Sequence, residues 1–260
     1  MSSQTSTGTP RVIHGGVYES DAQLAQYCEF HYGPEYLGVG NFPATCAHLC
    51  LRAMDGRPAR RALDLGCAVG RASFELARGF DHVDGVDACA RFIRLARSLQ
   101  AGARVSHVVP GEGELGSRRT VHLRQLGLTQ TRARVAFQHG DACALAPGLD
   151  AYDLILAANL IDRLRCPRRL LGQIHARLRQ GGLLILTSPY TWLTAFTPKE
   201  EWLGGFLRQG RAVHGLQGLH EVLDAHFLSL GEPRQIPFVI RETARKYQHT
   251  LAEMSIWEKR

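Results

Sequence analysis

The sequence lacks the features of a membrane, secreted or nucleic-acid-binding protein. No apolar run approaches the roughly 20 residues of a membrane-spanning helix. The first ten residues, MSSQTSTGTP, have neither the basic start nor the apolar stretch of a secretory signal. Lysine is scarce, and the net charge of +7 comes from arginines scattered singly and in pairs, without a basic stripe interleaved with aromatic residues. We therefore expect a cytoplasmic protein that binds no membrane and no nucleic acid.

The cysteines lack the spacing of a disulfide framework or a metal site. There are seven, an odd number, and no two form a Cys-x-x-Cys pair. Cys46 and Cys50 are spaced for one helix face, but only His48 lies near them in sequence, and zinc needs more ligands. We expect reduced, buried thiols and no metal.

A dinucleotide fingerprint is also missing. Residues 61–78 read RALDLGCAVGRASFELAR, which predicts a strand, a turn of small residues and a helix, and a second strand, VDGVD, ends at Asp87. A dinucleotide-binding turn needs glycine at its first, third and sixth positions. Counted from Gly66, the third position is Ala68 and the sixth is Arg71. The βαβ unit therefore predicts a different nucleotide.

The spacing Asp64-x-Gly66-x-Ala68-x-Gly70 resembles the turn of S-adenosylmethionine (SAM)-dependent methyltransferases. In that family an acidic residue closes the first strand, and the glycines let the methionine part of the cofactor lie against the backbone. Ala68 replaces a more usual glycine, which is tolerable if the backbone there has negative φ. The resemblance implies a Rossmann-like α/β fold with a seven-stranded, mostly parallel sheet whose last strand is antiparallel.

Strand ends supply candidate cofactor contacts, because ligands of open parallel sheets bind at the carboxyl ends of the strands. Asp87 would accept hydrogen bonds from both ribose hydroxyls, Asp141 would face the adenine edge, and Asn159 would lie beside the sulfonium. Each residue alone also fits a cap or a turn, but their order and spacing together favour a cofactor site. The predicted cofactor residues are Asp64, Gly66, Cys67, Ala68, Gly70, Arg71, Asp87, Ala88, Asp141, Ala142 and Asn159.

The pattern predicts one domain with two additions. Residues 1–16 are expected to be a disordered tail, and residues 17–260 a methyltransferase domain. Its helices at 17–32 and 42–54 would form a lid (17–56), and residues 101–132, which interrupt the α/β alternation, would be an insertion. The other expected elements are strands at 61–65, 82–86, 134–138, 153–158, 183–188, 227–240 and 249–257, and helices at 70–78, 88–100, 167–179, 198–208 and 215–225.

Five segments narrow the resemblance: YESDAQLAQYCEFHYG (18–33), ALDLGCAVGRASFELA (62–77), NLIDRL (159–164), LTSPYTWL (186–193) and PFVIRETARKYQ (237–248). They resemble the C-terminal methyltransferase domain of the ovothiol biosynthesis enzymes. The resemblance implies methylation of a ring nitrogen of 5-thiohistidine (4-mercaptohistidine) by SAM. In that family the domain usually follows an iron-dependent sulfoxide synthase. This sequence holds no such part, so we expect a free-standing or excised domain that pairs functionally with a separate sulfoxide synthase.

Two loops are candidates for holding the acceptor. In this fold the connection between the last two strands, IRETARKYQH (240–249), lies on the cofactor side. There Arg245 or Lys246 would pair with the amino acid's carboxylate and Glu242 with its ammonium, although a solvated hairpin tip is the alternative. After the fourth strand, Asp162 and Arg163 would contact the acceptor, or simply begin a helix.

Aromatic side chains and one proton acceptor would complete the site. Tyr190 and Trp192 would form a wall against the imidazole or, equally, pack as ordinary core residues. Tyr18 and Tyr32 would close over the cofactor or the substrate from the lid. His31 is interpreted as a packing residue. The predicted catalytic residues are Asp162, Glu242 and Tyr247, one of which would orient or take the ring proton, and the predicted substrate residues are Tyr18, Tyr32, Arg163, Tyr190, Trp192, Arg245 and Lys246.

Three other functions fit parts of the pattern. The first is a SAM-dependent methyltransferase for another small acceptor, such as a histidine derivative or a natural-product amine. The second is a non-catalytic SAM-binding module that scaffolds a sulfoxide synthase, against which the intact strand-end residues argue. The third is a DNA or RNA methyltransferase, which is disfavoured because AANLID rather than an Asn-Pro-Pro-Tyr motif follows the fourth strand.

Overall fold

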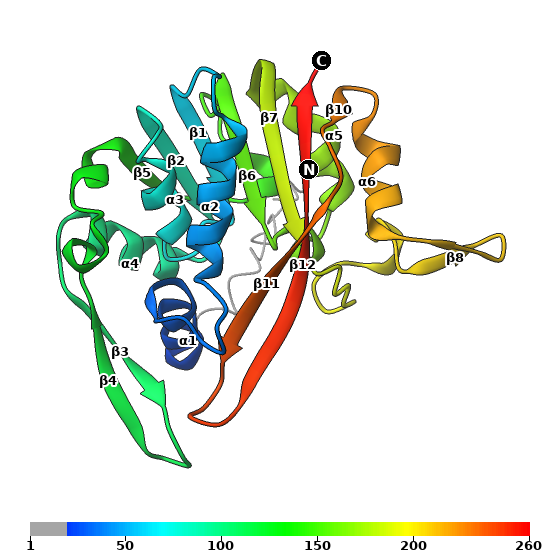
Figure 1. Ribbon diagram of the computed structural model, residues 1–260. Helices are drawn as coiled ribbons and strands as arrows, with labels where there is room; N and C mark the ends of the chain where they lie inside the picture. The colour runs from blue at the N-terminus through cyan, green and yellow to red at the C-terminus, as the bar shows by residue number, and fades with distance from the viewer. Residues whose placement is uncertain (1–19) are drawn as a thin grey trace, which may run out of the picture.

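A central eight-stranded sheet carries helices on both faces in the computed structural model, which describes residues 20–260 (Figure 1). The predicted tail at 1–16 and the predicted substrate residue Tyr18 lie outside the described residues. The strands of this sheet are β1 (Arg61–Leu65), β2 (His82–Asp87), β5 (Val135–His139), β6 (Tyr152–Ala158), β7 (Leu178–Ser188), β10 (Phe227–Ser229), β11 (Arg234–Arg241) and β12 (Tyr247–Lys259).

The strand order is β10–β12–β7–β6–β1–β2–β5, with β11 also paired to β12. The strands from β7 to β5 are mutually parallel, and β12 runs antiparallel to β7. This confirms the predicted Rossmann-like fold with an antiparallel last strand. The count is eight rather than seven because the sixth strand is in two pieces: β10 and β11 both pair with β12, separated by residues 230–233.

Two apolar cores hold the helices against the sheet. One core packs against the helices α1 to α4, and the other packs against α5 and α6. Helix α4 shows how the sequence achieves this, since Phe92, Ile93, Ala96 and Leu99 recur at helical spacing and are buried. The helices are α1 (Asp21–Tyr32), α2 (Phe42–Ala53), α3 (Arg71–Leu76), α4 (Ala90–Gln100), α5 (Pro167–Gln173) and α6 (Gly215–Leu223).

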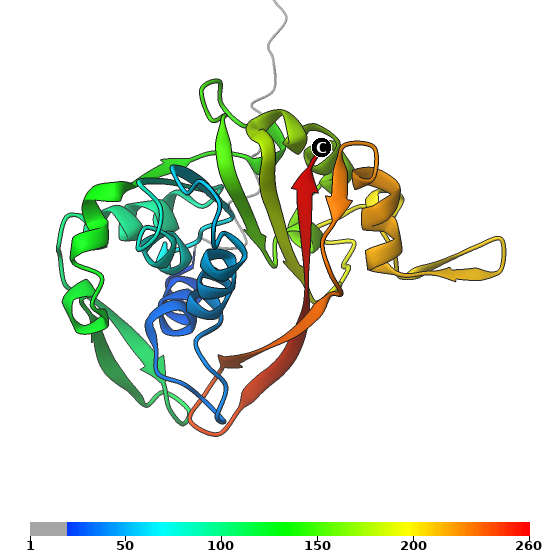
Figure 2. The ribbon, with the colours of Figure 1, turned by 45° about the horizontal axis from the view of Figure 1, so that its top comes forward.

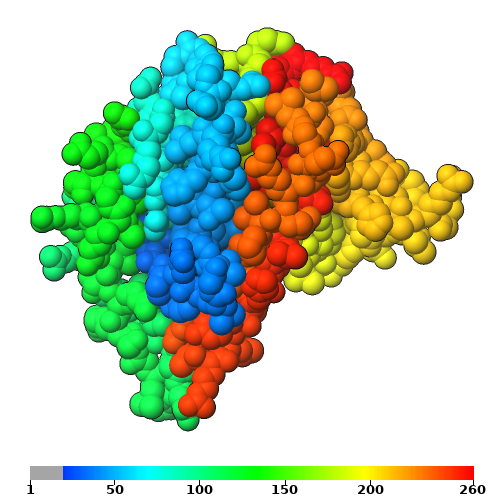
Figure 3. Space-filling model, in the orientation of Figure 1, coloured from blue at the N-terminus to red at the C-terminus, as the bar shows by residue number. Residues whose placement is uncertain are grey.

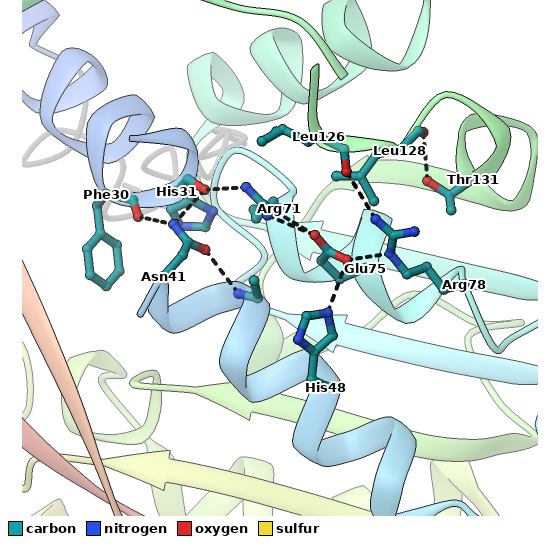
Figure 4. A network of polar contacts seen from close by, with 11 residues as sticks. Phe30, His31, Asn41, His48, Arg71, Glu75, Arg78, Leu126, Leu128 and Thr131 are labelled. Atoms are coloured by element: carbon teal, nitrogen blue, oxygen red, sulfur yellow. Dashed lines mark hydrogen bonds and ion pairs between the residues drawn. The ribbon is translucent and has the colours of Figure 1, made fainter. Parts of the chain in front are cut away.

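The lid helices begin at side-chain caps and are fastened to the nucleotide turn. Ser20 caps α1 and Asn41 caps α2, each accepting a hydrogen bond from a backbone N–H of the first turn. The Asn41 amide also donates to the carbonyls of Phe30 and His31, 3.1 and 3.0 Å away, at the end of α1 (Figure 4). One side chain therefore fixes the angle between the two helices.

Residues 101–132 lie outside the main sheet. They form an antiparallel hairpin of β3 (Val105–Pro110) and β4 (Gly116–Val121), followed by the short 3-10 helices η2 (Leu123–Leu126) and η3 (Gln130–Arg134). The sequence predicted no strands here. The valines of β3 do not alternate with polar residues, and almost every side chain of β4 is exposed or half-buried.

The prediction of a helix at 198–208 is wrong. Only the 3-10 turn η7 (Lys199–Glu201) forms, and β8 (Phe206–Arg208) then pairs with β9 (Arg211–Val213) as a projecting hairpin (Figure 1). Its turn residues Gln209 and Gly210 both have positive φ, 51° and 75°, as a tight hairpin turn requires. The predicted helix at 167–179 is also too long, because α5 ends at Gln173 and continues only as the 3-10 helix η6 (Ile174–Arg177) before β7.

The last hairpin reaches well beyond the sheet. Strand β12 pairs with β7 only from Glu253 onward, so residues 247–252 continue roughly 20 Å past the carboxyl end of β7. The tip meets the β3–β4 hairpin, where the backbone N–H of Ala244 donates to the carbonyl of Gly111 at 3.3 Å. Figures 2 and 3 show the two tips side by side beyond the lid helices. None of the helices in residues 20–260 is long and apolar enough to cross a membrane.

Candidate functional site

A cavity of about 890 Å³ lies where the predicted strand ends converge. This volume is within the range of ligand pockets and leaves room for two small molecules. Its walls come from the turn after β1, the lid helix α1, the ends of β2 and β6, and the loop after β7. Of the predicted cofactor residues, Asp64, Gly66, Cys67, Ala68, Asp87, Ala88, Asp141, Ala142 and Asn159 line it.

The turn after β1 is shaped by backbone conformations that favour glycine. Gly66 and Gly70 have φ of +72° and +91°, and a Cβ at Gly70 would stand 2.6 Å from Phe137 Cζ. Ala68 has φ of +46°, so the condition of a negative φ at Ala68 is not met. An alanine there costs about 1–2 kcal/mol relative to an unstrained backbone. This conformation accompanies a hydrogen bond of 2.9 Å from the Ala68 N–H to Asp87 Oδ2.

Asp87 is held with both carboxylate oxygens at the cavity. Its Oδ2 accepts from Ala68 N–H, and its Oδ1 accepts from Cys89 N–H at 2.7 Å. Each oxygen keeps a second lone pair, so the carboxylate can still accept hydrogen bonds from two neighbouring hydroxyl groups. Burial raises the pKa of Asp87, while the two backbone N–H groups oppose the shift. The arrangement suits the two hydroxyls of a ribose.

Asp64 is more deeply buried and carries a strongly shifted pKa. Its side chain is 2% exposed, and its Oδ2 accepts a hydrogen bond of 2.6 Å from Ser73 Oγ. Burial, together with the nearby charge of Asp87, raises the pKa of Asp64 to about 7. A carboxyl group that titrates near neutrality at the cavity wall responds directly to a bound cation.

Asn159 and Asp141 each use one oxygen locally and leave other polar atoms for a ligand. The Thr187 hydroxyl donates to Asn159 Oδ1 at 2.9 Å, which leaves the Asn159 amide N–H groups without a partner among the described residues. Asn159 also has φ of +50°, an uncommon conformation outside glycine. Asp141 Oδ1 accepts from Cys143 N–H at 2.8 Å, and within residues 20–260 its other oxygen has no hydrogen-bond partner.

Gly70 and Arg71 do not line the cavity, although the sequence placed them in the cofactor set. Arg71 turns away from the cavity, pairs with Glu75 on the next turn of α3, and donates to the carbonyl of His31 (Figure 4). Its role is therefore to hold the lid helix against α3. A side chain at the first position of a helix points either way, and sequence spacing does not decide which.

Asp162 is the predicted acceptor residue that the structure places on the cavity wall with an unused atom. It is fully buried on the short 3-10 helix η5 (Ile161–Arg163). Its Oδ2 accepts from the Thr191 N–H (3.1 Å), the Thr191 hydroxyl (2.9 Å) and Arg163 (3.0 Å). Its Oδ1 is buried with no hydrogen-bond partner within residues 20–260. A buried carboxylate oxygen without a donor is costly, so it marks the place of a ligand N–H or O–H.

Arg163 also lines the cavity, whereas the predicted aromatic wall does not. The Arg163 guanidinium lies 5.1 Å from the centre of the Phe196 ring. Trp192 is buried against Trp202, and the Tyr190 hydroxyl donates to Glu253 at 2.9 Å, so neither faces the cavity. Phe196, which the sequence pattern did not predict, lines the cavity beside Arg163.

Tyr32 and the tip of the last hairpin lie away from the cavity as well. The Tyr32 hydroxyl donates to the carbonyl of Val69 at 2.7 Å and so fastens α1 to the turn after β1. The predicted catalytic residues Glu242 and Tyr247 and the predicted substrate residues Arg245 and Lys246 belong to the tip, and none of them lines the cavity. The reason is the length of β11 and β12, which carries the tip past the cavity to the β3–β4 hairpin. There Lys246 pairs with Glu242.

His31 is buried against the rings of Tyr27, Phe30 and Tyr32, as its interpretation as a packing residue implies, and it also lines the cavity. Burial, and to a smaller extent the charge of Arg71, lower the pKa of His31 to about 3. Its ring is therefore neutral at physiological pH. The sequence signal for this position is that His31 lies four residues after Tyr27, so the two side chains share one face of α1. Both residues line the cavity. In the described part of the chain, no three His, Cys, Asp or Glu side chains are placed to hold a metal ion.

A family model described as a methyltransferase domain matches residues 40–226. No curated protein matches the chain.

Two solved structures illustrate the similarity in fold. The N-methyltransferase NodS from Bradyrhizobium japonicum WM9, in complex with S-adenosylhomocysteine, is 15% identical, with a TM-score of 0.53 over 92% of this chain and 99% of that one. Magnesium protoporphyrin IX methyltransferase from Synechocystis PCC 6803, with bound SAM, is 13% identical, with a TM-score of 0.57 over 99% and 100%.

Proposed function

The chain belongs to the methyltransferase-domain family, and we propose that this SAM-dependent methyltransferase transfers a methyl group to an imidazole ring nitrogen of 5-thiohistidine, forming ovothiol A. That the protein transfers a methyl group follows from its membership of the methyltransferase-domain family. The acceptor rests on the resemblance of five segments to ovothiol biosynthesis enzymes and on the chemistry of the cavity wall. Pairing with a separate sulfoxide synthase and a cytoplasmic location remain predictions.

The cofactor fits the residues that line the cavity. Asp87 offers two carboxylate oxygens to the ribose hydroxyls, and Asp141 offers its unused oxygen to the adenine amino group. Asp64 places a carboxyl group beside a cofactor that carries positive charge. When bound, SAM supplies a methyl group activated by its sulfonium.

The unpartnered Asp162 Oδ1 is the observation that carries the proposal about the acceptor. A neutral imidazole has one N–H donor and one nitrogen with a lone pair. If Asp162 accepts the N–H, the second nitrogen is left neutral and able to attack. The three hydrogen bonds to Asp162 Oδ2 fix the carboxylate, so the ring is held in one orientation.

The same contact explains how a nitrogen reacts in preference to sulfur, which is the stronger nucleophile. The ring N–H bound to Asp162 sets where the ring substituents point, and the sulfur is kept away from the line of attack. Methylation adds positive charge to the ring, and the buried carboxylate of Asp162 stabilises that charge until the N–H proton is released.

The direct test is to incubate the protein with SAM and 5-thiohistidine and to locate the added carbon by mass spectrometry and NMR. We expect a methyl group on a ring nitrogen. Asp162→Asn should lower kcat/KM by about 100-fold, because the carboxylate orients the ring and stabilises its charge. Asp55→Asn, at an exposed position outside the cavity, is the matched control and should change little.

Two results would contradict the proposal. Methylation of sulfur would show that the ring is oriented differently. Turnover of a different small amine or histidine derivative, with none of 5-thiohistidine, would establish the alternative of another acceptor.

A further inference from the structure

The cavity is also lined by charged side chains of both signs from elements outside the nucleotide turn, of which Arg169 and Glu200 are exposed and Glu201 is half-buried. Arg169, on the first turn of α5, lines it from one element, and Glu200 and Glu201, on η7, line it from another. No ion pair or hydrogen bond of Arg169 is present within the described part of the chain, and neither glutamate pairs with a cation there. The opposite charges therefore stand apart.

Glu201 shows the stronger requirement for a ligand. Its Oε2 is buried and has no hydrogen-bond partner among residues 20–260. The fully buried Asp162, on the same cavity wall, likewise has an unpartnered oxygen. Two buried acceptors without donors in one cavity call for a ligand with at least two N–H groups at separate places.

An α-amino acid with an imidazole side chain has this pattern of groups. Its ammonium supplies N–H donors, its ring supplies one more, and its carboxylate needs a cation such as the fork of an arginine. The tip of the last hairpin, which the sequence suggested for this task, already pairs Lys246 with Glu242 and lies outside the cavity. On the cavity wall, by contrast, Arg169 and Glu201 have no ion pair among the described residues, and Glu201, unlike the exposed Glu200, also has a buried oxygen without a donor.

We propose that the backbone groups of the amino-acid acceptor bind between these two residues, with the α-carboxylate on Arg169 and the α-ammonium on Glu201. This site rests on the proposed function, which identifies the acceptor's ring as the imidazole that Asp162 would hold. It adds a specificity site that requires an intact amino acid and would reject the corresponding amine.

Calorimetry on the protein saturated with S-adenosylhomocysteine tests this with three probes: 5-thiohistidine, its decarboxylated amine, and its deaminated acid. The wild type should bind 5-thiohistidine at least tenfold more tightly than either of the others. Arg169→Gln should bind 5-thiohistidine no more tightly than the amine, because the α-carboxylate has lost its partner. Glu201→Gln should bind 5-thiohistidine no more tightly than the acid, because the α-ammonium has lost its partner. Arg169→Lys should restore part of the preference for 5-thiohistidine over the amine.

Arg211→Gln and Glu232→Gln change the same residue types at exposed positions outside the cavity, and should keep both preferences. Affinity for S-adenosylhomocysteine should stay within twofold in every variant, which shows that each variant is folded. The proposal is wrong if Arg169→Gln and Glu201→Gln keep the wild-type preferences, or if the wild type binds no α-amino acid.

The outcome also separates this site from the proposed function. If 5-thiohistidine is not methylated, but L-histidine binds and loses affinity in both variants, the site stands and the proposed acceptor is wrong. If 5-thiohistidine is methylated with unchanged KM in both variants, the proposed function stands and this site is wrong.

Discussion

At the scale of single residues, Asp64 links the cavity to pH. The pKa of this carboxyl is about 7 in the folded protein, against about 3.9 in an unfolded chain. The folded state therefore binds a proton that the unfolded state does not, so the contribution of Asp64 to stability is greatest at low pH and is lost as pH rises through 7. A bound cation opposes this uptake of a proton by the folded state, because it favours the ionised carboxylate.

SAM affinity should therefore rise as pH increases from 5.5 to 7, by up to about tenfold per unit, with release of a proton. His31 lines the same cavity but has a pKa of about 3, so it does not titrate in this range. Calorimetry in buffers of different ionisation enthalpy measures both the affinity and the proton count. Asp64→Asn should flatten the dependence, and an unchanged slope in that variant would assign the proton to another group.

Residue types and spacing predicted which strand-end residues meet at one cavity, but not which aromatic side chains line it. Asp64 and Asp87 lie at the ends of β1 and β2, and Asp141 and Asn159 follow β5 and β6. Because parallel strands end at the same edge of a sheet, their convergence follows from local pattern. Trp192 has no such constraint. Its direction depends on packing against Trp202, which only the folded chain brings beside it.

At the scale of elements, the insertion hairpin braces the lid helix. Glu29 of α1 is 4% exposed and is bonded to His107 Nε2 of β3 at 2.8 Å, to Arg119 of β4 and to Tyr36. Burial acts to raise the pKa of Glu29, but the hydrogen bonds from His107 and Tyr36 and the charge of Arg119 outweigh it and lower the pKa. The opposite face of α1 lines the cavity.

Glu29→Gln should lower the free energy of unfolding by about 2–3 kcal/mol, because it leaves the buried ring of His107 and the half-buried guanidinium of Arg119 without their carboxylate. Denaturant unfolding at pH 7 measures the loss. Since the pKa of Glu29 is lowered on folding, its contribution is present above about pH 4.3 and disappears as the pH falls further. The difference between variant and wild type should therefore shrink as the pH is lowered below about 4.3.

Glu221→Gln provides the comparison. Glu221 forms an exposed pair with Arg208 at 2.8 Å, and its loss should cost less than about 0.5 kcal/mol. Equal losses in the two variants would mean that the contacts of Glu29 do not brace the lid.

Elements with strong periodicity were predicted well, and those made by long-range pairing were not. Helix α2 and strand β1 match their predicted ranges closely because each has a uniform apolar pattern and a clear cap or turn. The β3–β4 and β8–β9 hairpins were missed, since their side chains are largely exposed and offer no alternation to detect.

At the scale of the whole molecule, segments far apart in sequence enclose one cavity. The lid is held to the nucleotide turn by Tyr32 and Arg71, and to the insertion by Glu29. The insertion meets the last hairpin at Gly111 and Ala244. Figure 3 shows these parts in contact along one side of the molecule. The part of the cavity that is formed by the turn after β1 and by helix α1 is therefore made of elements held to their neighbours by hydrogen bonds.

Calorimetric titration with SAM, alongside NADH, tests the central claim that this cavity binds SAM through its strand-end carboxylates. The wild type should bind SAM and show no heat with NADH. Asp87→Ala should weaken SAM binding by about 100-fold, since it removes two charge-assisted hydrogen bonds worth about 3 kcal/mol together, while Asp55→Ala should bind normally. Binding of NADH without SAM, or unchanged SAM affinity in Asp87→Ala, would contradict the account.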